Sequence, residues 1–401
     1  MTTPTADEIS RWIVQATLDG GDEASIVDGT CARLVDVGVP LMRAALVSDM
    51  LDPTFDSLGV RWTRGKGAVH EAFLRTPDAE TNEEWLTSPF HVLVAGREDR
   101  FRRRLDATYR KGEFPVLDEF LQRGGTDYVA MILRLGGGMW LGETRGVVAS
   151  WLTDASAGFD DASVELLART LPALSTMFLW RSMQRSVRAL MTTYLGTDAA
   201  VRVLAGNVVR GRAETIRAVV WYSDLVGFTR IADAHEPEAV LAMLNDYAGA
   251  QVETIEAQGG HVLKFIGDGL LAIFPDRDES NACERALDAA AEARRRLDAL
   301  NEQRRAAGLP VSDAHVALHI GELLYGNVGS PRRLDFTVLG AAVNEAARIE
   351  ALCGSLDQRV IVSSAFAVAA GAEARSRLVS LGRYAMKGVA RPQELYTLDP
   401  D

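Results

Sequence analysis

The second half of the sequence alternates strand-like and helix-like segments, and this order limits the fold more than any other feature of the chain. β-Branched and aromatic residues mark the strands, and apolar residues at helical spacing mark the helices between them. In chain order the segments are residues 217–223, 236–260, 261–266, 270–275, 282–303 and 314–329, the last of which is predicted to be a pair of strands. The order strand, helix, strand, strand, helix, strand (βαββαβ) predicts an antiparallel or mixed sheet with helices on one face.

The first half of the chain has the pattern of a second α+β domain. Its predicted segments are a helix at 6–20, strands at 41–51, 128–135 and 145–153, and a capped helix with an Asp-rich start at 159–180. This order fits an antiparallel sheet flanked by helices, and it resembles a GAF-type sensor domain over roughly residues 25–180. The resemblance implies a GAF-like α/β sensor or regulatory domain at residues 1–178. Its small-molecule effector is not identified by the sequence.

A helical stretch with a repeating apolar pattern joins the two halves. Its apolar positions step by 3, 4, 3 and 4 residues, and they are Trp180, Met183, Val187, Leu190 and Tyr194. This repeat is typical of a two-helix coiled coil, although it is shorter than the roughly three to four heptads that a firm assignment needs. Two interpretations stay open, a dimerising signalling helix or a helix packed on its own domain. With the irregular stretch after it, the helix is predicted to form a linker at residues 179–209.

Bulk composition excludes several classes of protein. The chain has 401 residues, enough for two domains of ordinary size, and its net charge of −12 argues against nucleic-acid binding, which favours clustered Lys and Arg. Cys31, Cys283 and Cys353 are scattered without a C-x-x-C motif, which favours a reducing compartment over a zinc or disulfide framework. No run reaches the roughly 18 apolar residues of a membrane span, and the N-terminus lacks a signal-peptide core. A cytoplasmic location is therefore predicted.

Two aspartates stand at the ends of apolar strands. Asp224 follows the strand at 217–223, and Asp268 lies between Gly267 and Gly269 at the tip of a predicted tight hairpin. An aspartate in a turn is ordinarily only solvated. If the first and second strands of this domain are adjacent, however, both carboxylates reach the same end of the sheet, where they repel each other unless cations lie between them.

Such a carboxylate pair suits Mg²⁺, which takes one or two protein carboxylates and completes its shell with water and phosphate oxygens. Two metal ions about 4 Å apart stabilise both the attacking and the leaving oxygen of a displacement at phosphorus. The residues after Asp224 begin a predicted helix, and their free N–H groups form a candidate phosphate cradle made of Val226, Gly227, Phe228 and Thr229. The two aspartates are therefore predicted to be metal ligands.

Three motifs resemble, in order and spacing, those of the class III nucleotide cyclases: "WYSDLVGFT" (221–229), "KFIGDGLLAIF" (264–274) and "LDFTVLGAAVNEAARIE" (334–350). The resemblance covers about residues 210–398. It implies a ferredoxin-like βαββαβ catalytic domain at residues 210–401, which would convert ATP to 3′,5′-cyclic AMP and pyrophosphate. It also implies a head-to-tail homodimer whose sites are built from both partners, with two Mg²⁺ or Mn²⁺ ions in each site.

The resemblance carries over to the site residue by residue. Asp224 and Asp268 match the two metal-binding aspartates, and Leu225 would lend a backbone carbonyl. Lys264 and Thr337 match the two purine-reading positions. Lysine can donate to adenine N1 and the threonine hydroxyl can accept from the N6 amine, so this pair favours ATP. A guanylate cyclase usually carries glutamate and a small, cysteine-like residue at these positions.

Three further residues match positions that act on ribose and phosphate. Asn344 and Arg348 match the pair that orients the ribose and stabilises transition-state charge, for which a planar, permanently charged guanidinium is suited. Lys387 matches a lysine that contacts the terminal phosphates. Asn344 and Arg348 are four residues apart, a spacing that any surface helix shows, so this pair gains meaning only beside the other matches.

Two positions depart from the commoner family pattern. Thr337 stands where aspartate is more usual, which is typical of the subclass IIIb, and some members of that subclass respond to bicarbonate. Glu322 stands where some relatives have a phosphate-binding arginine. Two alternative functions stay open: a guanylate cyclase, which Lys264 and Thr337 disfavour, and a non-catalytic nucleotide-binding or dimerisation module, which the intact aspartates and the Asn/Arg pair disfavour.

Overall fold

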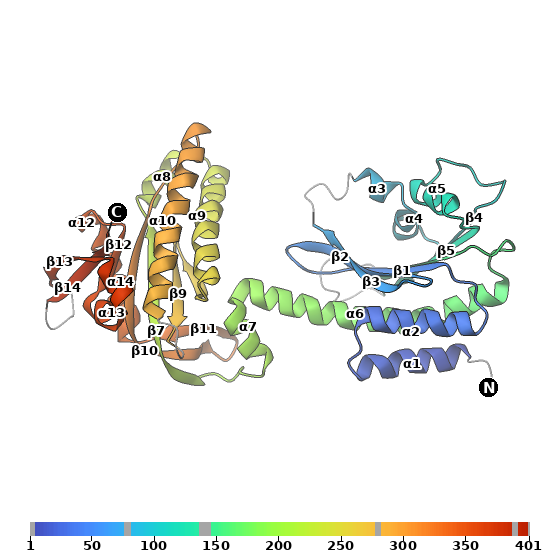
Figure 1. Cartoon of the computed structure of the whole chain (residues 1–401), viewed down its shortest axis with the longest axis horizontal. Helices are drawn as coiled ribbons and strands as arrows, with labels where there is room; N and C mark the ends of the chain where they lie inside the picture. The colour runs from blue at the N-terminus through green and yellow to red at the C-terminus, as the bar shows by residue number, and fades with distance from the viewer. Residues whose placement is uncertain (1–4, 76–81, 136–145, 277–281, 387–391, 400–401) are drawn as a thin grey trace. The chain divides into compact units, whose positions relative to one another are not determined.

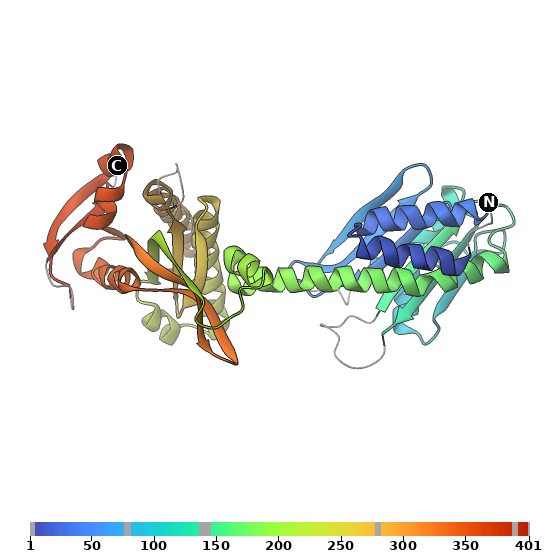
Figure 2. The same ribbon diagram turned by 90° about the horizontal axis from the view of Figure 1, so that it is seen from below.

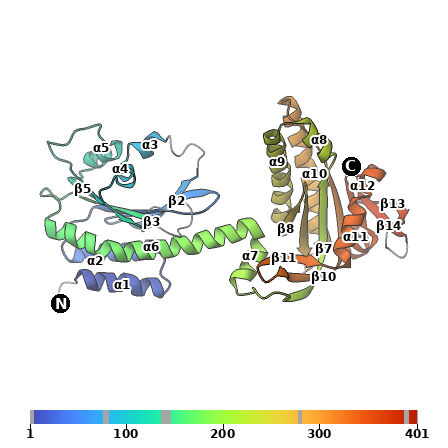
Figure 3. The same ribbon diagram turned by 180° about the vertical axis from the view of Figure 1, so that it is seen from behind.

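The chain divides into two compact units, each with its own sheet and its own core. The computed structural model describes residues 5–75, 82–135, 146–276, 282–386 and 392–399. The units are Met1–Leu190 and Met191–Asp401, so that their boundary falls inside the predicted linker at 179–209. Figures 1, 2 and 3 show the elements of each unit from three sides.

The first unit is built on a six-stranded sheet whose neighbouring strands are all antiparallel, in the order β3-β2-β1-β6-β5-β4. The strands are β1 (Arg43–Asp49), β2 (Phe55–Thr63), β3 (Gly67–Leu74), β4 (Arg100–Arg104), β5 (Asp127–Arg134) and β6 (Gly146–Thr153). The sequence pattern predicted β1, β5 and β6 and missed the other three. β3 and β4 lie at the two edges of the sheet, where partial burial leaves little apolar alternation to detect.

Helices cover both faces of this sheet (Figure 1). One face carries α1 (Ala6–Leu18), α2 (Glu23–Asp36) and the first part of α6 (Asp161–Leu195), and the other carries α4 (Pro89–Ala95) and α5 (Pro115–Gln122), with α3 (Glu83–Leu86) beside α4. Strand β5 serves both cores, because successive side chains point to opposite faces. Val129 enters the core under α1, α2 and α6, whereas Tyr128 and Ala130 enter the core under α4 and α5.

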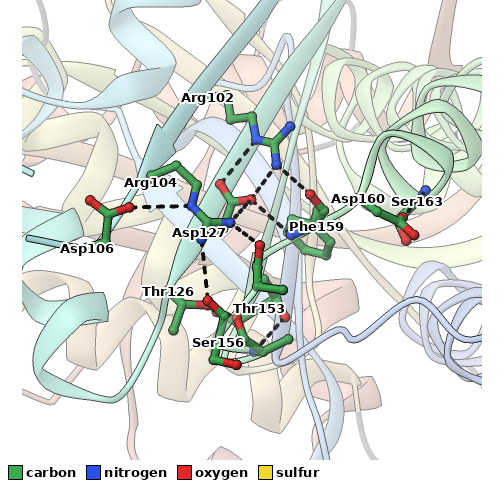
Figure 4. Close-up of polar contacts among 12 residues, drawn as sticks. Arg102, Arg104, Asp106, Thr126, Asp127, Thr153, Ser156, Phe159, Asp160 and Ser163 are labelled. Carbon is green, nitrogen blue, oxygen red and sulfur yellow. Dashed lines mark hydrogen bonds and ion pairs between the residues drawn. The ribbon is translucent and has the colours of Figure 1, made fainter. Parts of the chain in front are cut away.

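A buried carboxylate fixes the segment that leads into α6 (Figure 4). Asp127 is fully buried and accepts hydrogen bonds from Arg102 at 2.7 Å and from the Phe159 N–H at 3.0 Å. Arg102 also donates to the Phe159 carbonyl at 2.6 Å, and Arg104 donates to the Ala157 carbonyl. The start of α6 is therefore tied to β4 and β5 by charge-assisted hydrogen bonds.

Most of the predicted apolar seam of α6 is exposed in the structure, and Leu190 is half-buried. Trp180 is 55% exposed, and Met183 and Val187 are also exposed. This part of α6 contacts the first unit through other residues. Ser182 donates to the Asp49 carbonyl, Ser186 accepts from the Leu51 N–H, and Arg185 pairs with Glu23. The seam is therefore not the face by which α6 packs on the first unit.

The second unit contains an eight-stranded mixed sheet. Its order is β13-β14-β12-β10-β7-β9-β8, with β11 paired to β10, and the β10–β12 pairing is parallel. The strands are β7 (Ala213–Leu225), β8 (His261–Ile266), β9 (Gly269–Pro275), β10 (Ala314–Ser330), β11 (Arg333–Leu339), β12 (Val360–Ser363), β13 (Leu378–Tyr384) and β14 (Gln393–Leu398). The mixed sheet expected from the sequence is present.

Two details of this sheet correct the sequence analysis. The strand next to β7 is the third of the series, β9, and not the second, β8. Residues 314–329 form one long strand, β10, and not a pair of strands, and the hairpin partner of β10 is β11. Gly321 lies within β10 and serves a close contact: a Cβ atom on it would lie 2.7 Å from Ala342 Cβ.

Helices cover both faces of the second sheet, so the prediction of helices on one face is wrong (Figures 1 and 3). The crossover helices α9 (Pro237–Ala257) and α10 (Ala282–Ala306) pack on one face, and α11 (Ala341–Glu350) packs on the other. Strand β7 alternates between them, because Trp221 faces α10 and Val220 faces α11. The shorter helices are α7 (Thr197–Leu204), α8 (Phe228–Ala234), α12 (Cys353–Leu356), α13 (Ser364–Ala369) and α14 (Ala372–Ser376).

Both units contain long helices. The longest helix in the described residues is α6, with 35 residues. Within the described residues, no helix has the length and apolar composition that crossing a membrane requires. Cys31, Cys283 and Cys353 are buried.

Candidate active site

Asp224 and Asp268 are brought together at one end of the second sheet. Ser223 of β7 pairs with Leu270 of β9, and Gly267 and Asp268 form the two-residue turn that joins β8 to β9. Gly267 adopts a φ of +62°, which suits the first central position of such a turn. Because β9 is the neighbour of β7, the turn before β9 places Asp268 at the end of β7.

The hairpin lies directly against the Asp224 backbone. A Cβ atom added to Gly269 would meet the Ser223 carbonyl oxygen at 2.1 Å and Asp224 Oδ1 at 3.0 Å. Only glycine can occupy this position without a shift of the backbone, so Gly269 is what allows the two aspartates to approach each other. Sequence analysis assigned the glycine only to the turn.

The Asp224 carboxyl group is harder to ionise because it lies beside Asp268. Burial, the negative charge of Asp268 and the hydrogen bond between the two groups raise the pKa of Asp224 to about 6. A hydrogen bond between two carboxyl groups needs one proton, because an ionised carboxylate only accepts. A divalent cation could replace that proton, so the pair fits a metal ion.

Other ligands for such a cation are few in the protein itself. Across the described ranges, no group of three or more His, Cys, Asp or Glu side chains lies close enough to hold a metal ion. Leu225, at the end of β7, is the predicted source of a backbone carbonyl ligand. A metal ion at the pair would therefore complete its shell with water and with oxygens of a bound ligand, as Mg²⁺ commonly does.

Glu350 is a third acidic residue near the pair, and sequence analysis did not single it out. Burial and the negative charges of Asp224 and Asp268 raise the pKa of Glu350 to about 7. Its Oε1 lies 3.8 Å from Nδ1 of His315, the residue directly opposite Asp224 on β10. Burial lowers the pKa of His315, so it is a poor source of compensating charge. The only sequence signal was the position of Glu350 two residues after Arg348.

The two predicted purine-reading residues come from β8 and β11. Lys264 forms an ion pair with Asp335, and Asp335 and Thr337 lie on the same face of β11. Thr337 is 5% exposed, and its Oγ1 atom has no hydrogen-bond partner among the described residues. A buried hydroxyl without a partner is unusual, and a ligand that donates a hydrogen bond would satisfy it.

The turn after Asp224 is anchored at its first residue. The Val226 N–H donates to the Asp313 carbonyl at 2.8 Å, so this amide is not free as the phosphate-cradle prediction required. Gly227 adopts a φ of +67° and precedes α8, which begins at Phe228. The predicted cradle is thereby reduced to the amides of Gly227, Phe228 and Thr229.

The remaining predicted residues lie on α11 and β10 or outside the described residues. Asn344 and Arg348 are exposed on α11, and within the described part of the chain neither side chain makes a hydrogen bond or an ion pair. Glu322 is exposed on β10, opposite Arg217 of β7. Lys387 lies outside the described residues.

Comparisons with known proteins agree with the resemblance that the three motifs indicate. Residues 212–400 match the family model described as "Adenylate and Guanylate cyclase catalytic domain". The chain is 34% identical over 161 residues to an adenylate cyclase of Anabaena cylindrica, covering 39% of this chain and 31% of the relative. It is 30% identical over 225 residues to adenylate cyclase 1 of Rhizobium meliloti (strain 1021), covering 52% of this chain and 34% of the relative. The chain therefore spans about a third of the length of these relatives.

Among solved structures, a bacterial light-regulated adenylyl cyclase is similar to most of the chain. The TM-score is 0.50 at 17% sequence identity, and the match covers 89% of this chain and 93% of that one. At this identity the match concerns the fold alone.

Proposed function

Because residues 212–400 match the family model of adenylate and guanylate cyclase catalytic domains, we propose that the chain is an adenylate cyclase. It would convert ATP to 3′,5′-cyclic AMP and pyrophosphate. The observation that carries the proposal is the pair Asp224 and Asp268, two carboxyl groups held against each other at the end of β7. A half-buried pair of like charges is costly without a cation, and it is useful where phosphate oxygens must be bound.

Divalent metal ions are the general cofactors of this family, and we propose two Mg²⁺ or Mn²⁺ ions in each site. When bound, the metal supplies Lewis-acid stabilisation of phosphate oxygens and lowers the pKa of the attacking hydroxyl. Asp224, Asp268 and the Leu225 carbonyl would hold it. The amides of Gly227, Phe228 and Thr229 would bind phosphate oxygens at the start of α8. Lys387 would contact the terminal phosphates.

The chain's own residues would also position the adenine and the ribose. Lys264 donates to adenine N1, and the Thr337 hydroxyl, which has no hydrogen-bond partner among the described residues, accepts from the N6 amine. Asn344 orients the ribose so that its 3′-oxygen attacks the α-phosphorus while the bond to the pyrophosphate oxygen breaks. Arg348 stabilises the negative charge that grows on phosphate oxygens in the transition state.

We further propose that the active site is shared between two copies of the chain. Asn344 and Arg348 are exposed and unpartnered in the described part of one chain, as expected of residues that act on a partner's nucleotide. An equimolar mixture of Asp224→Ala and Arg348→Ala would form heterodimers with one intact site and one doubly defective site. Recovered activity supports shared sites, and no recovery after verified subunit exchange would contradict them.

The first unit is proposed to be a GAF-like regulatory domain for a small-molecule effector. The exposed seam of α6 supports its proposed role as a dimerising signalling helix. Bicarbonate is a candidate effector of the catalytic unit, because Thr337 gives the site its subclass IIIb character. The cytoplasmic location predicted from the cysteines also stays a proposal.

The activity is tested with the purified full-length chain, ATP or GTP, and Mg²⁺ or Mn²⁺, by measuring the cyclic nucleotide formed. We expect cyclic AMP from wild type and more than a hundredfold loss in Asp224→Ala and in Asp268→Ala. Asp288→Asn is a matched control, since Asp288 pairs with Arg377 elsewhere in the same unit. Preferential formation of cyclic GMP would identify a guanylate cyclase. Absence of any product with both nucleotides and both metals would favour a non-catalytic module.

A further inference from the structure

A buried polar network lies next to the turn that follows Asp224. Tyr247 of α9 is fully buried, and Asn301 of α10 is 2% exposed. The Tyr247 hydroxyl accepts from the Ser312 N–H at 2.7 Å and donates to Asn301 Oδ1. Asn301 Nδ2 in turn donates to the Ser312 carbonyl at 2.7 Å. Both backbone polar groups of Ser312 are thus held by side chains of the two crossover helices.

Ser312 and Asp313 hold the turn that follows Asp224 through two hydrogen bonds to Val226. Ser312 Oγ donates to the Val226 carbonyl at 2.9 Å, and the Val226 N–H donates to the Asp313 carbonyl at 2.8 Å. Val226 lies directly between Leu225, the proposed source of a metal-binding carbonyl, and Gly227, where the proposed phosphate-binding amides begin. The N–H and the carbonyl of Val226 are therefore both held by hydrogen bonds to residues 312 and 313.

We propose that Tyr247 and Asn301 are positioning residues for the nucleotide's phosphates, acting through Ser312 on the backbone of residues 225–229. This inference rests on the proposed function. Loss of the Tyr247 hydroxyl leaves the Ser312 N–H and Asn301 Oδ1 without their partner in a buried place, and the segment at 312–313 must shift to find another. The shift reaches Val226 because two hydrogen bonds join it to that segment. Displacements near 1 Å at groups that position a substrate can cost about a hundredfold in rate.

The test compares two variants that each lose one buried hydroxyl in the second unit. Tyr247→Phe keeps the ring and removes only the oxygen. Thr397→Val is the matched control: Thr397 is 8% exposed and its Oγ1 donates to the Val360 carbonyl at 2.8 Å, between β14 and β12. We measure melting temperature, kcat and KM for ATP on the full chain. Both variants should lose thermal stability, but only Tyr247→Phe should lose kcat, by at least tenfold, with a smaller change in KM.

A second variant covers the case in which Tyr247→Phe does not fold. Ser312 is only partly buried, so Ser312→Ala removes the link to the Val226 carbonyl at little cost to folding. It should lower kcat severalfold at an unchanged melting temperature. If Ser312→Ala, and Tyr247→Phe where it folds, keep kcat within twofold of Thr397→Val, the network supports only the fold and the inference is wrong.

Hydrogen exchange separates this inference from the proposed function. In the nucleotide-free chain, amides in the peptide covering residues 225–229 should exchange faster in Tyr247→Phe than in Thr397→Val. If wild type makes no cyclic nucleotide yet this peptide is loosened, the proposed function fails while the coupling from Tyr247 to the turn holds. Unchanged exchange in this peptide would overturn the coupling itself.

Discussion

Replacing Asp224 with asparagine should stabilise the metal-free protein while it removes activity. Asparagine has nearly the same shape, and its amide can donate to the Asp268 carboxylate without a proton from solvent. In wild type the pKa of Asp224 rises from its ordinary value of 3.8 to about 6. That difference corresponds to about 3 kcal/mol against the ionised form. Because part of the side chain stays in contact with water, we discount this to about 1–2 kcal/mol.

The sign of the effect sets its pH range. An acid whose pKa is higher in the folded state binds more protons there than when unfolded, so wild-type stability falls as the pH rises from about 4 through about 6. Above that range the full cost is present, and below pH 4 it is absent. The advantage of Asp224→Asn should therefore be present at pH 7.5 and vanish near pH 4.

Scanning calorimetry of the full chain in EDTA measures this effect in the transition of the second unit. A gain of about 1–2 kcal/mol corresponds to roughly 2–8 °C for a unit of this size. Added Mg²⁺ or Mn²⁺ should then raise the melting temperature of wild type but not of Asp224→Asn, because only a protein that binds the ion is stabilised by it. If Asp224→Asn melts at or below wild type in EDTA at pH 7.5, the pair is a structural hydrogen bond and the reasoning fails.

Three further variants test other parts of the proposal. Glu350→Gln should raise the metal-free melting temperature at pH 8 and weaken Mn²⁺ binding severalfold in a calorimetric titration, because it removes negative charge beside the aspartates; unchanged Mn²⁺ affinity would contradict this. Lys264→Glu combined with Thr337→Cys should lower kcat/KM for ATP at least a hundredfold and raise it for GTP, and a loss for both nucleotides would mean that these residues do not read the purine. Val187→Ser with Leu190→Ser should change turnover and dimerisation of the full chain, whereas unchanged values for both would refute the signalling role of the seam.

Local patterns predicted the parts of the second unit that depend on neighbours in sequence. The hairpin around Asp268 is one example, because Gly267 and the flanking apolar strands specify a two-residue turn. The order of strands was harder. The adjacency of β7 and β9 depends on the position in the sheet at which the chain continues after the crossover helix α9. No residue near Asp224 indicates this position. The two aspartates meet in spite of that error because Asp268 belongs to the turn shared by β8 and β9.

Features that depend on long-range contacts could not be read from the sequence. Gly321 has no side chain and so accommodates Ala342 of α11, a contact that no local pattern indicates. Val226 looked like a residue with a free amide, but the carbonyl of Asp313, far along the chain, occupies it. Glu350 carries no motif of its own, and its relation to the aspartates exists only once α11 packs on β7 and β10. In each case the deciding partner lies dozens of residues away or on another element.

The position of the aspartate pair explains how the protein tolerates it. Like charges at the end of a mobile loop would move apart, and the site would lose its geometry. Asp224 instead follows Trp221, which is fully buried, on a strand with helices packed on both of its faces. Asp268 is held in a turn that lies against the Ser223 carbonyl, because Gly269 has no side chain to keep the two apart. The cost of about 1–2 kcal/mol worked out above for Asp224 is small beside the burial of such a strand, so the core can keep the carboxylates together until a cation relieves their repulsion.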